Sequence, residues 1–99
     1  MIIHRLIAAV KPECQQQAIG LFQEVRATLP DPKAMRIYTS HPAGAPGYQV
    51  GWDIEFESLT ALDQWLQQQA ANPQSGDWFR RYEPLLQPGT GTSIWGLVE

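Results

Sequence analysis

The segment Tyr48–Phe56 places the strongest constraint on how this chain can fold, because apolar and polar residues alternate in it without exception. Its apolar residues fall on one side of an extended chain, and its polar or small residues fall on the other. A period of two with aromatic and β-branched residues is typical of a β-strand with two unlike faces. We therefore predict that this segment is the central strand of a single sheet.

Two of the other predicted strands flank the first predicted helix. Residues 2–10 form a nearly continuous apolar run that is interrupted by His4 and Arg5, as expected of a strand buried on both faces. Over residues 14–29 apolar side chains recur at the helical period, and the prolines that follow should end this helix. Residues 34–40 then alternate again and predict the second strand.

The last part of the chain predicts two helical pieces and a closing strand. Ser58 is a favourable N-cap for a helix over residues 59–70. Asp77 is expected to cap a short helical turn over residues 78–82, one face of which is wholly aromatic. A glycine-rich turn then leads into a final strand at residues 92–99.

The order of elements is therefore β-α-β-β-α-β, and residues 41–47, which are rich in proline and glycine, join the two middle strands. Right-handed crossovers leave one arrangement, an α+β ferredoxin-like fold with sheet order 4-1-3-2. We predict a single domain over residues 1–99 with its helices on one face of the sheet. The other face is bare, and a second copy of the chain is the expected cover, giving a homodimer.

The charge and composition of the chain exclude several classes of function. The net charge is −3 with no basic cluster, which argues against binding to nucleic acid. No stretch approaches the roughly 20 apolar residues of a membrane span, and the first residues do not read as a signal peptide. The single cysteine, Cys14, excludes an intrachain disulfide and is expected to be inert. We predict a cytoplasmic protein.

Three segments carry a resemblance to a known family. They are Lys11-Pro12-Glu13 after the first strand, the run from Trp52 to Ser58 that leads into a Leu/Trp helix, and the aromatic run from Trp78 to Leu86. In this order they resemble the dimeric α+β barrel superfamily, which includes antibiotic-biosynthesis monooxygenase-like and stress-responsive barrel domains. The resemblance covers nearly the whole chain and implies the ferredoxin-like fold and a two-fold pair.

The resemblance implies less about activity. Haem-degrading barrels of this type pair a strand-one asparagine with a helical tryptophan and an axial histidine. Here Trp65 could match the tryptophan, but the first strand has no asparagine and the last helical piece has no histidine. Cofactor-independent monooxygenases of the superfamily place asparagine and tryptophans around a quinol-like substrate, and Asn72 lies at a helix end instead. We therefore predict no cofactor.

The two histidines do not predict a metal site. His4 lies in the first strand and His41 lies at the far end of the hairpin, so a shared metal ion is not expected. His4 alone is a candidate acid/base group, or else a hydrogen-bonded, partly buried histidine near a strand end. Tyr38 is the other candidate for proton transfer.

Asp53 and Glu55 lie on one face of the central strand, about 7 Å apart. They could act as paired carboxylates in acid/base catalysis. A simpler interpretation is cross-strand ion pairing, with Arg36 on a neighbouring strand and with Arg5.

Four tryptophans in 99 residues either fill the core or line a pocket for a flat aromatic ligand. The substrate-binding candidates are Trp52, Trp65, Trp78 and Tyr82. Three hypotheses follow: a small monooxygenase-like enzyme acting on a flat apolar substrate, a binding module without catalysis, and a structural dimer whose apolar residues leave no cavity. The first two require an enclosed pocket, and only the first requires an acid/base group at its wall.

Overall fold

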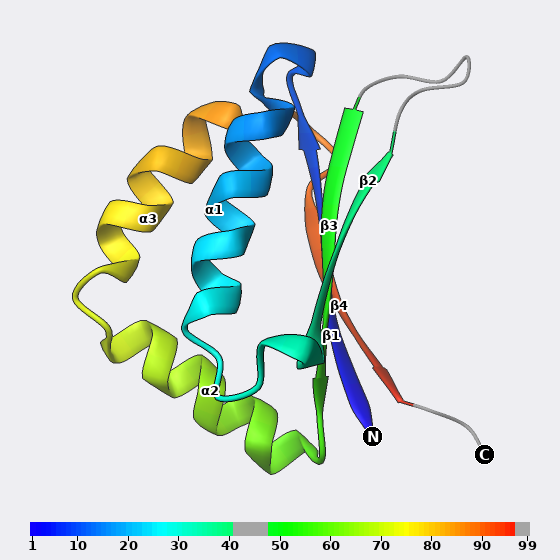
Figure 1. Ribbon diagram of the computed structural model, residues 1–99, viewed down its shortest axis with the longest axis vertical. Helices are drawn as coiled ribbons and strands as arrows, with labels where there is room; N and C mark the ends of the chain where they lie inside the picture. Colours follow the sequence, from blue (N-terminus) through cyan, green and yellow to red (C-terminus); the bar gives the residue numbers. More distant parts are fainter. Residues whose placement is uncertain (41–47, 97–99) are drawn as a thin grey trace.

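A computed structural model describes residues 1–40 and 48–96. Within these residues four antiparallel strands form one sheet, and three α-helices cover one of its faces (Figure 1). The strands are β1 (Ile2–Val10), β2 (Met35–Ser40), β3 (Tyr48–Phe56) and β4 (Gly91–Gly96). The helices are α1 (Gln15–Ala27), α2 (Leu59–Ala71) and α3 (Ser75–Tyr82). The strand order is β2-β3-β1-β4, which confirms the predicted ferredoxin-like sheet.

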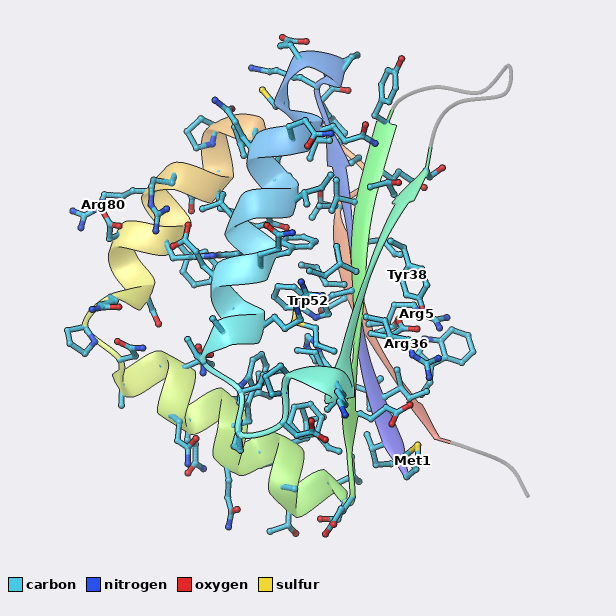
Figure 2. The ribbon with its side chains drawn as sticks, viewed as in Figure 1. Met1, Arg5, Arg36, Tyr38, Trp52 and Arg80 are labelled. Atoms are coloured by element: carbon cyan, nitrogen blue, oxygen red, sulfur yellow. The ribbon has the colours of Figure 1, made fainter. Side chains whose placement is uncertain are left out.

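The alternation in β3 sets the two faces of the sheet, as predicted. Val50, Trp52 and Ile54 are buried under the helices. Figure 2 shows Trp52 between the sheet and the helices, whereas Arg5, Arg36 and Tyr38 project from the opposite, open face. Because β3 pairs with both β1 and β2, its pattern fixes which side chains of these neighbours face the helices.

Strand β1 was predicted to be buried on both faces, but in the single chain only one of its faces is buried. His4, Leu6, Ala8 and Val10 are buried, but the residues between them are only half-buried. The physical reason is that the helices cover one face and leave the other open (Figure 1). Because nearly every residue of this run is apolar, β1 also has apolar side chains on the open face, at Ile3 and Ile7.

The helix ends follow local sequence signals, with one correction. Ser58 caps α2, since its hydroxyl accepts a hydrogen bond from the Ala61 amide at 3.1 Å. Asp77 is not the cap of the next helix, because α3 starts at Ser75 with Gln74 as its N-cap. The turn before α3 is held by Asn72, whose side-chain oxygen accepts from the Gln74 amide at 2.9 Å.

Two predicted segments lie wholly or partly outside the described residues. They are the loop over residues 41–47, which includes His41, and residues 97–99 of the predicted last strand. In the part of the chain that the structure describes, no helix is long and apolar enough to cross a membrane.

Candidate functional site

A cavity of about 780 Å³ lies between the helices and the sheet. This volume is within the range of small-molecule sites in proteins. β1 and β3 form its floor with His4, Leu6 and Trp52. The helical wall includes Trp65 of α2 and Trp78 and Tyr82 of α3, and its rim includes polar side chains such as Gln69. The cavity therefore gathers His4 and all four substrate-binding candidates from four elements of the chain.

His4 is held by a hydrogen bond from Trp52. The Trp52 indole N–H donates to Nδ1 of His4 at 3.1 Å, and both side chains are buried. Since Nδ1 accepts this bond, a neutral imidazole carries its hydrogen on Nε2. Burial lowers the pKa of His4, because the charged form loses hydration, so the neutral form is favoured. In this arrangement His4 is a hydrogen-bond donor through Nε2.

Aromatic rings form a continuous cluster around His4. The ring centroids of His4 lie 5.8 Å from Trp65 and 6.1 Å from Trp52. Trp78 lies 6.4 Å from Trp52 and 4.6 Å from Tyr82. Such spacings are those of favourable tilted and edge-to-face aromatic pairs. The cluster gives the cavity a rigid apolar wall that suits a flat ring system.

Two polar atoms of this wall have no hydrogen-bond partner among the described residues. They are the indole nitrogen of Trp65 and the hydroxyl of Tyr82. Burial raises the pKa of Tyr82 to about 12, so the hydroxyl keeps its proton at neutral pH. Both groups are therefore unpaired donors among the described residues, and the surrounding side chains seal them from solvent.

The structure places Tyr38 away from the cavity. Tyr38 is 47% exposed. Figure 2 shows its side chain on the open face of the sheet. Tyr38 pairs with Gly51 across β2 and β3, next to the pair of Arg36 and Asp53. His4 and Tyr38 thus lie on opposite faces, and the structure does not bring these two proton-transfer candidates together.

The open face holds an ion pair rather than a pair of catalytic carboxylates. Arg5 donates to both carboxylate oxygens of Asp53, at 2.7 and 2.9 Å. These hydrogen bonds hold the pKa of Asp53 below its usual range. Arg5 is therefore the direct partner, and Arg36 acts on Asp53 only through its charge. Trp95 also belongs to this face, with the Arg5 guanidinium 5.5 Å from its ring centre.

Comparison with known proteins identifies the fold. No family model matches the sequence, and no curated protein matches it. An uncharacterized NIPSNAP domain protein from Burkholderia xenovorans has 12% identity and a TM-score of 0.71, over 99% of this chain and 95% of that chain. An antibiotic biosynthesis monooxygenase has 14% identity and a TM-score of 0.66 over the whole of both chains. A candidate monooxygenase of the same description from Nitrosomonas europaea has 13% identity and a TM-score of 0.64, also over both whole chains.

The fold is the ferredoxin-like α+β fold of these solved structures. This confirms the architecture expected from the sequence. At 12–14% identity the likeness to solved structures concerns the fold alone. Any activity therefore depends on the residues of the cavity rather than on the fold.

Within the described part of the chain, no group of three or more His, Cys, Asp or Glu residues could hold a metal ion. His41 lies outside the described residues. Cys14 is half-buried just before α1.

The rim of the cavity carries an ion pair that the sequence analysis did not predict. Arg81 of α3 binds both carboxylate oxygens of Glu24 in α1, at 2.7 and 2.8 Å, and also Asp77 at 3.1 Å. Deeper in, the Trp78 indole donates to the Leu21 carbonyl at 2.9 Å. Both contacts fasten α3 to α1. The spacing of Asp77 and Arg81 was a readable i,i+4 signal, but the pairing with Glu24 was not.

Acid should destabilise the folded chain through His4. Because the pKa of His4 is lower in the folded chain than its ordinary value near 6.5, the unfolded chain binds the extra proton first. Stability should then be fully present above pH 6.5 and fall as the pH drops toward 5, by at most about 1.4 kcal/mol per pH unit. Urea unfolding at pH 7, 6 and 5 measures this loss.

The matched variant for this experiment is His4→Gln, since an amide oxygen can still accept the Trp52 hydrogen bond but does not titrate. The carboxylates are unchanged in this variant, so their acid titration cancels in the comparison. If the wild type and His4→Gln lose equal stability between pH 7 and pH 5, the loss is not caused by His4.

Proposed function

We propose that this protein binds a flat, largely apolar small molecule in the cavity between its helices and its sheet. The observation that carries the proposal is the convergence of His4, Trp52, Trp65, Trp78 and Tyr82 on a cavity of about 780 Å³. A ring system of two or three fused rings matches an aromatic wall of this kind. If these residues had a purely structural role, no cavity of this size would be expected. The cavity therefore favours binding.

The proposal includes a homodimer that covers the open face. Support comes from the dimeric-barrel fold and from the side chains of that face, where Trp95 and Tyr38 are 53% and 47% exposed. Ile3 and Ile7 are half-buried beside them. An apolar surface of this kind requires a partner, and a two-fold pair buries the same patch on both copies. The proposal places the protein in the cytoplasm, since Cys14 has no second cysteine in the chain to pair with.

A second candidate function is cofactor-independent oxygenation of a quinol-like substrate. It is favoured by the monooxygenase descriptions of proteins with the same fold. In this candidate the substrate itself is the reductant. One atom of O₂ becomes bonded to a ring carbon, and the other leaves as water. His4 contributes by donating its Nε2–H to an oxygen of the substrate. Oxygen uptake on addition of a quinol, which an inert binding module would not show, tests this candidate.

Binding is tested by the indole N–H signals of the four tryptophans in a ¹⁵N-correlated NMR spectrum. We expect naphthalene, fluorene or phenanthrene to shift the signals of Trp52, Trp65 and Trp78, because these residues line the cavity. The Trp95 signal serves as an internal control, since Trp95 lies on the opposite face beside Arg5. If none of the three hydrocarbons moves any cavity signal, the binding proposal fails.

Two variants sharpen this measurement. Trp78→Ala removes part of the aromatic wall and should weaken hydrocarbon binding about 10-fold or more, given the area that a tryptophan buries. Tyr38→Phe changes an aromatic residue on the far face and should leave binding unchanged. Equal affinities of the two variants would contradict the location of the site.

A further inference from the structure

We propose that the cavity is a pH switch, which holds its ligand while His4 is neutral and releases the ligand when His4 takes up a proton. This inference rests on the proposed binding function and concerns the regulation of the same site. Two features of the cavity floor carry it. They are the direction of the hydrogen bond between Trp52 and His4, and the lack of an acceptor for a charged His4 among the described residues.

The hydrogen bond between Trp52 and His4 forms only with a neutral histidine. The indole N–H of Trp52 is the donor and Nδ1 of His4 is the acceptor, at 3.1 Å. An indole nitrogen cannot accept a hydrogen bond, and a protonated imidazole carries a hydrogen on both of its nitrogens. Protonation therefore sets two N–H groups against each other within a buried pair. One of the two rings must turn or move, and both residues line the cavity.

The neighbours of His4 on the inner face of the sheet are apolar or aromatic. His4 lies opposite Ile54 of β3 and Ile94 of β4, and the ring centre of Trp65 in α2 is 5.8 Å from that of His4. None of these three side chains can accept a hydrogen bond from a charged imidazole. A buried charge without a partner is costly, and the lowered pKa of His4 agrees with this cost.

The titratable side chains around the floor are engaged elsewhere or stay neutral. Those that line the cavity together with His4 are Glu24, Asp77, Arg81 and Tyr82. The two carboxylates both bind the guanidinium at the rim, and burial raises the pKa of the tyrosine to about 12. On the opposite face of the sheet, Arg5 pairs with Asp53. A proton on His4 therefore adds a charge without a counter-ion among the described residues.

A flat apolar ligand makes this charge still less favourable. His4 is 8% exposed at the floor of the cavity, and a ligand seated there covers the exposure that remains. Removing hydration from a charged ring costs more free energy than removing it from a neutral ring. Because linkage is reciprocal, a ligand that disfavours the protonated form is bound more weakly by that form. Acid should therefore empty the cavity.

The test uses the wild-type protein and naphthalene, which has no titratable group. The pKa of His4 is first measured in the ligand-free protein from its imidazole NMR signals. The dissociation constant of naphthalene is then measured one pH unit above and one pH unit below that pKa. We expect binding to be about 5- to 10-fold weaker at the lower pH, since one proton can change affinity by at most about 10-fold per pH unit. Naphthalene should in turn lower the pKa of His4.

Two variants assign the effect to its residue. His4→Gln keeps an acceptor for Trp52 but takes up no proton, so its affinity for naphthalene, whatever its value, should change by less than about 2-fold over the same pH range. Glu24→Gln removes a rim carboxylate and should keep the pH dependence of the wild type, because the hydrogen bonds from Arg81 hold the pKa of Glu24 below its usual range. If His4→Gln does not fold or bind, the effect of naphthalene on the pKa of His4 in the wild type decides alone.

The outcomes separate this inference from the binding function. Absence of naphthalene binding at the higher pH overturns both. Equal binding at the two pH values, or a His4 pKa that naphthalene leaves unchanged, overturns the switch alone, as does a loss of affinity in His4→Gln equal to that of the wild type. The switch also fails if His4 titrates only while the circular dichroism signal of the fold is being lost, because it requires protonation within the folded chain.

Discussion

Replacing Trp52 by alanine will lower the free energy of unfolding by about 3–5 kcal/mol, the usual cost of removing a large aromatic side chain from a core. Trp52 is 6% exposed, its ring centre is 4.7 Å from that of Phe22, and its indole bonds to His4. The substitution leaves a cavity and also leaves Nδ1 of His4 buried without a donor. For a domain whose total stability is about 5–15 kcal/mol, this loss is severe, and urea unfolding followed by circular dichroism measures it.

Two further variants divide this effect into its parts. Trp52→Phe keeps an aromatic ring but removes the donor to His4, and should cost about 1–3 kcal/mol for the unpaired nitrogen and the lost ring volume. Leu59→Ala, at a residue 56% exposed in the first turn of α2, should change stability by about 0.5 kcal/mol at most. A cost for Trp52→Ala as small as that of Leu59→Ala would mean that Trp52 is not part of the core.

The second large effect concerns the association of two chains. Wild-type protein is expected to sediment at about 22 kDa, twice the 11.1 kDa of one chain, and Trp95→Asp should shift it to the monomer. Trp95 lies on the open face with 53% of its surface exposed, so its replacement should not disturb the fold of the single chain. An aspartate there would place a charge in the proposed interface beside Arg5, which Asp53 already pairs, and would remove the apolar ring, which should weaken association about 100-fold or more.

The control for this experiment is Gln67→Asp, which adds the same charge to an exposed residue of α2 on the helical side. This variant should remain a dimer. Analytical ultracentrifugation over a range of concentrations distinguishes the cases, with circular dichroism to verify the fold. If wild-type protein sediments as an 11.1 kDa particle throughout, the proposed homodimer and the two-fold barrel built from it fail together.

The sequence already indicated which face of the sheet the side chains of β2 occupy. The choice of Tyr38 as a functional candidate did not use this information. Tyr38 alternates with Ile37 and has the same parity as Arg36, so the pattern of β2 already indicated the open face. The hypothesis that named Tyr38 as an alternative to His4 for proton transfer overlooked this parity. The sequence did not indicate which face Trp95 occupies, because neither set of alternating residues in β4 is clearly polar. In the single chain, both faces of β4 are exposed.

The pairing of His4 with Trp52 needed the tertiary structure. The sequence placed His4 in the first strand and Trp52 on the inner face of the central strand, but not the register between them. In the structure His4 lies opposite Ile54, and Trp52 lies opposite Leu6, which makes His4 and Trp52 diagonal neighbours on one face. A shift of the register by one residue would have moved every side chain of one strand to the other face.

The sequence by itself determined the local structure: the alternation of β3, the helical periods, the Ser58 cap and hence the order and class of the fold. Each of these depends on interactions between residues near one another in the chain, which leave a periodic or positional pattern. Only the tertiary structure decided that Arg5 rather than Arg36 bonds to Asp53 and that Arg81 fastens α3 to Glu24. It also decided that the Trp65 indole nitrogen and the Tyr82 hydroxyl have no partner among the described residues. These contacts join distant segments, so they depend on strand register and helix placement, and no local pattern encodes them.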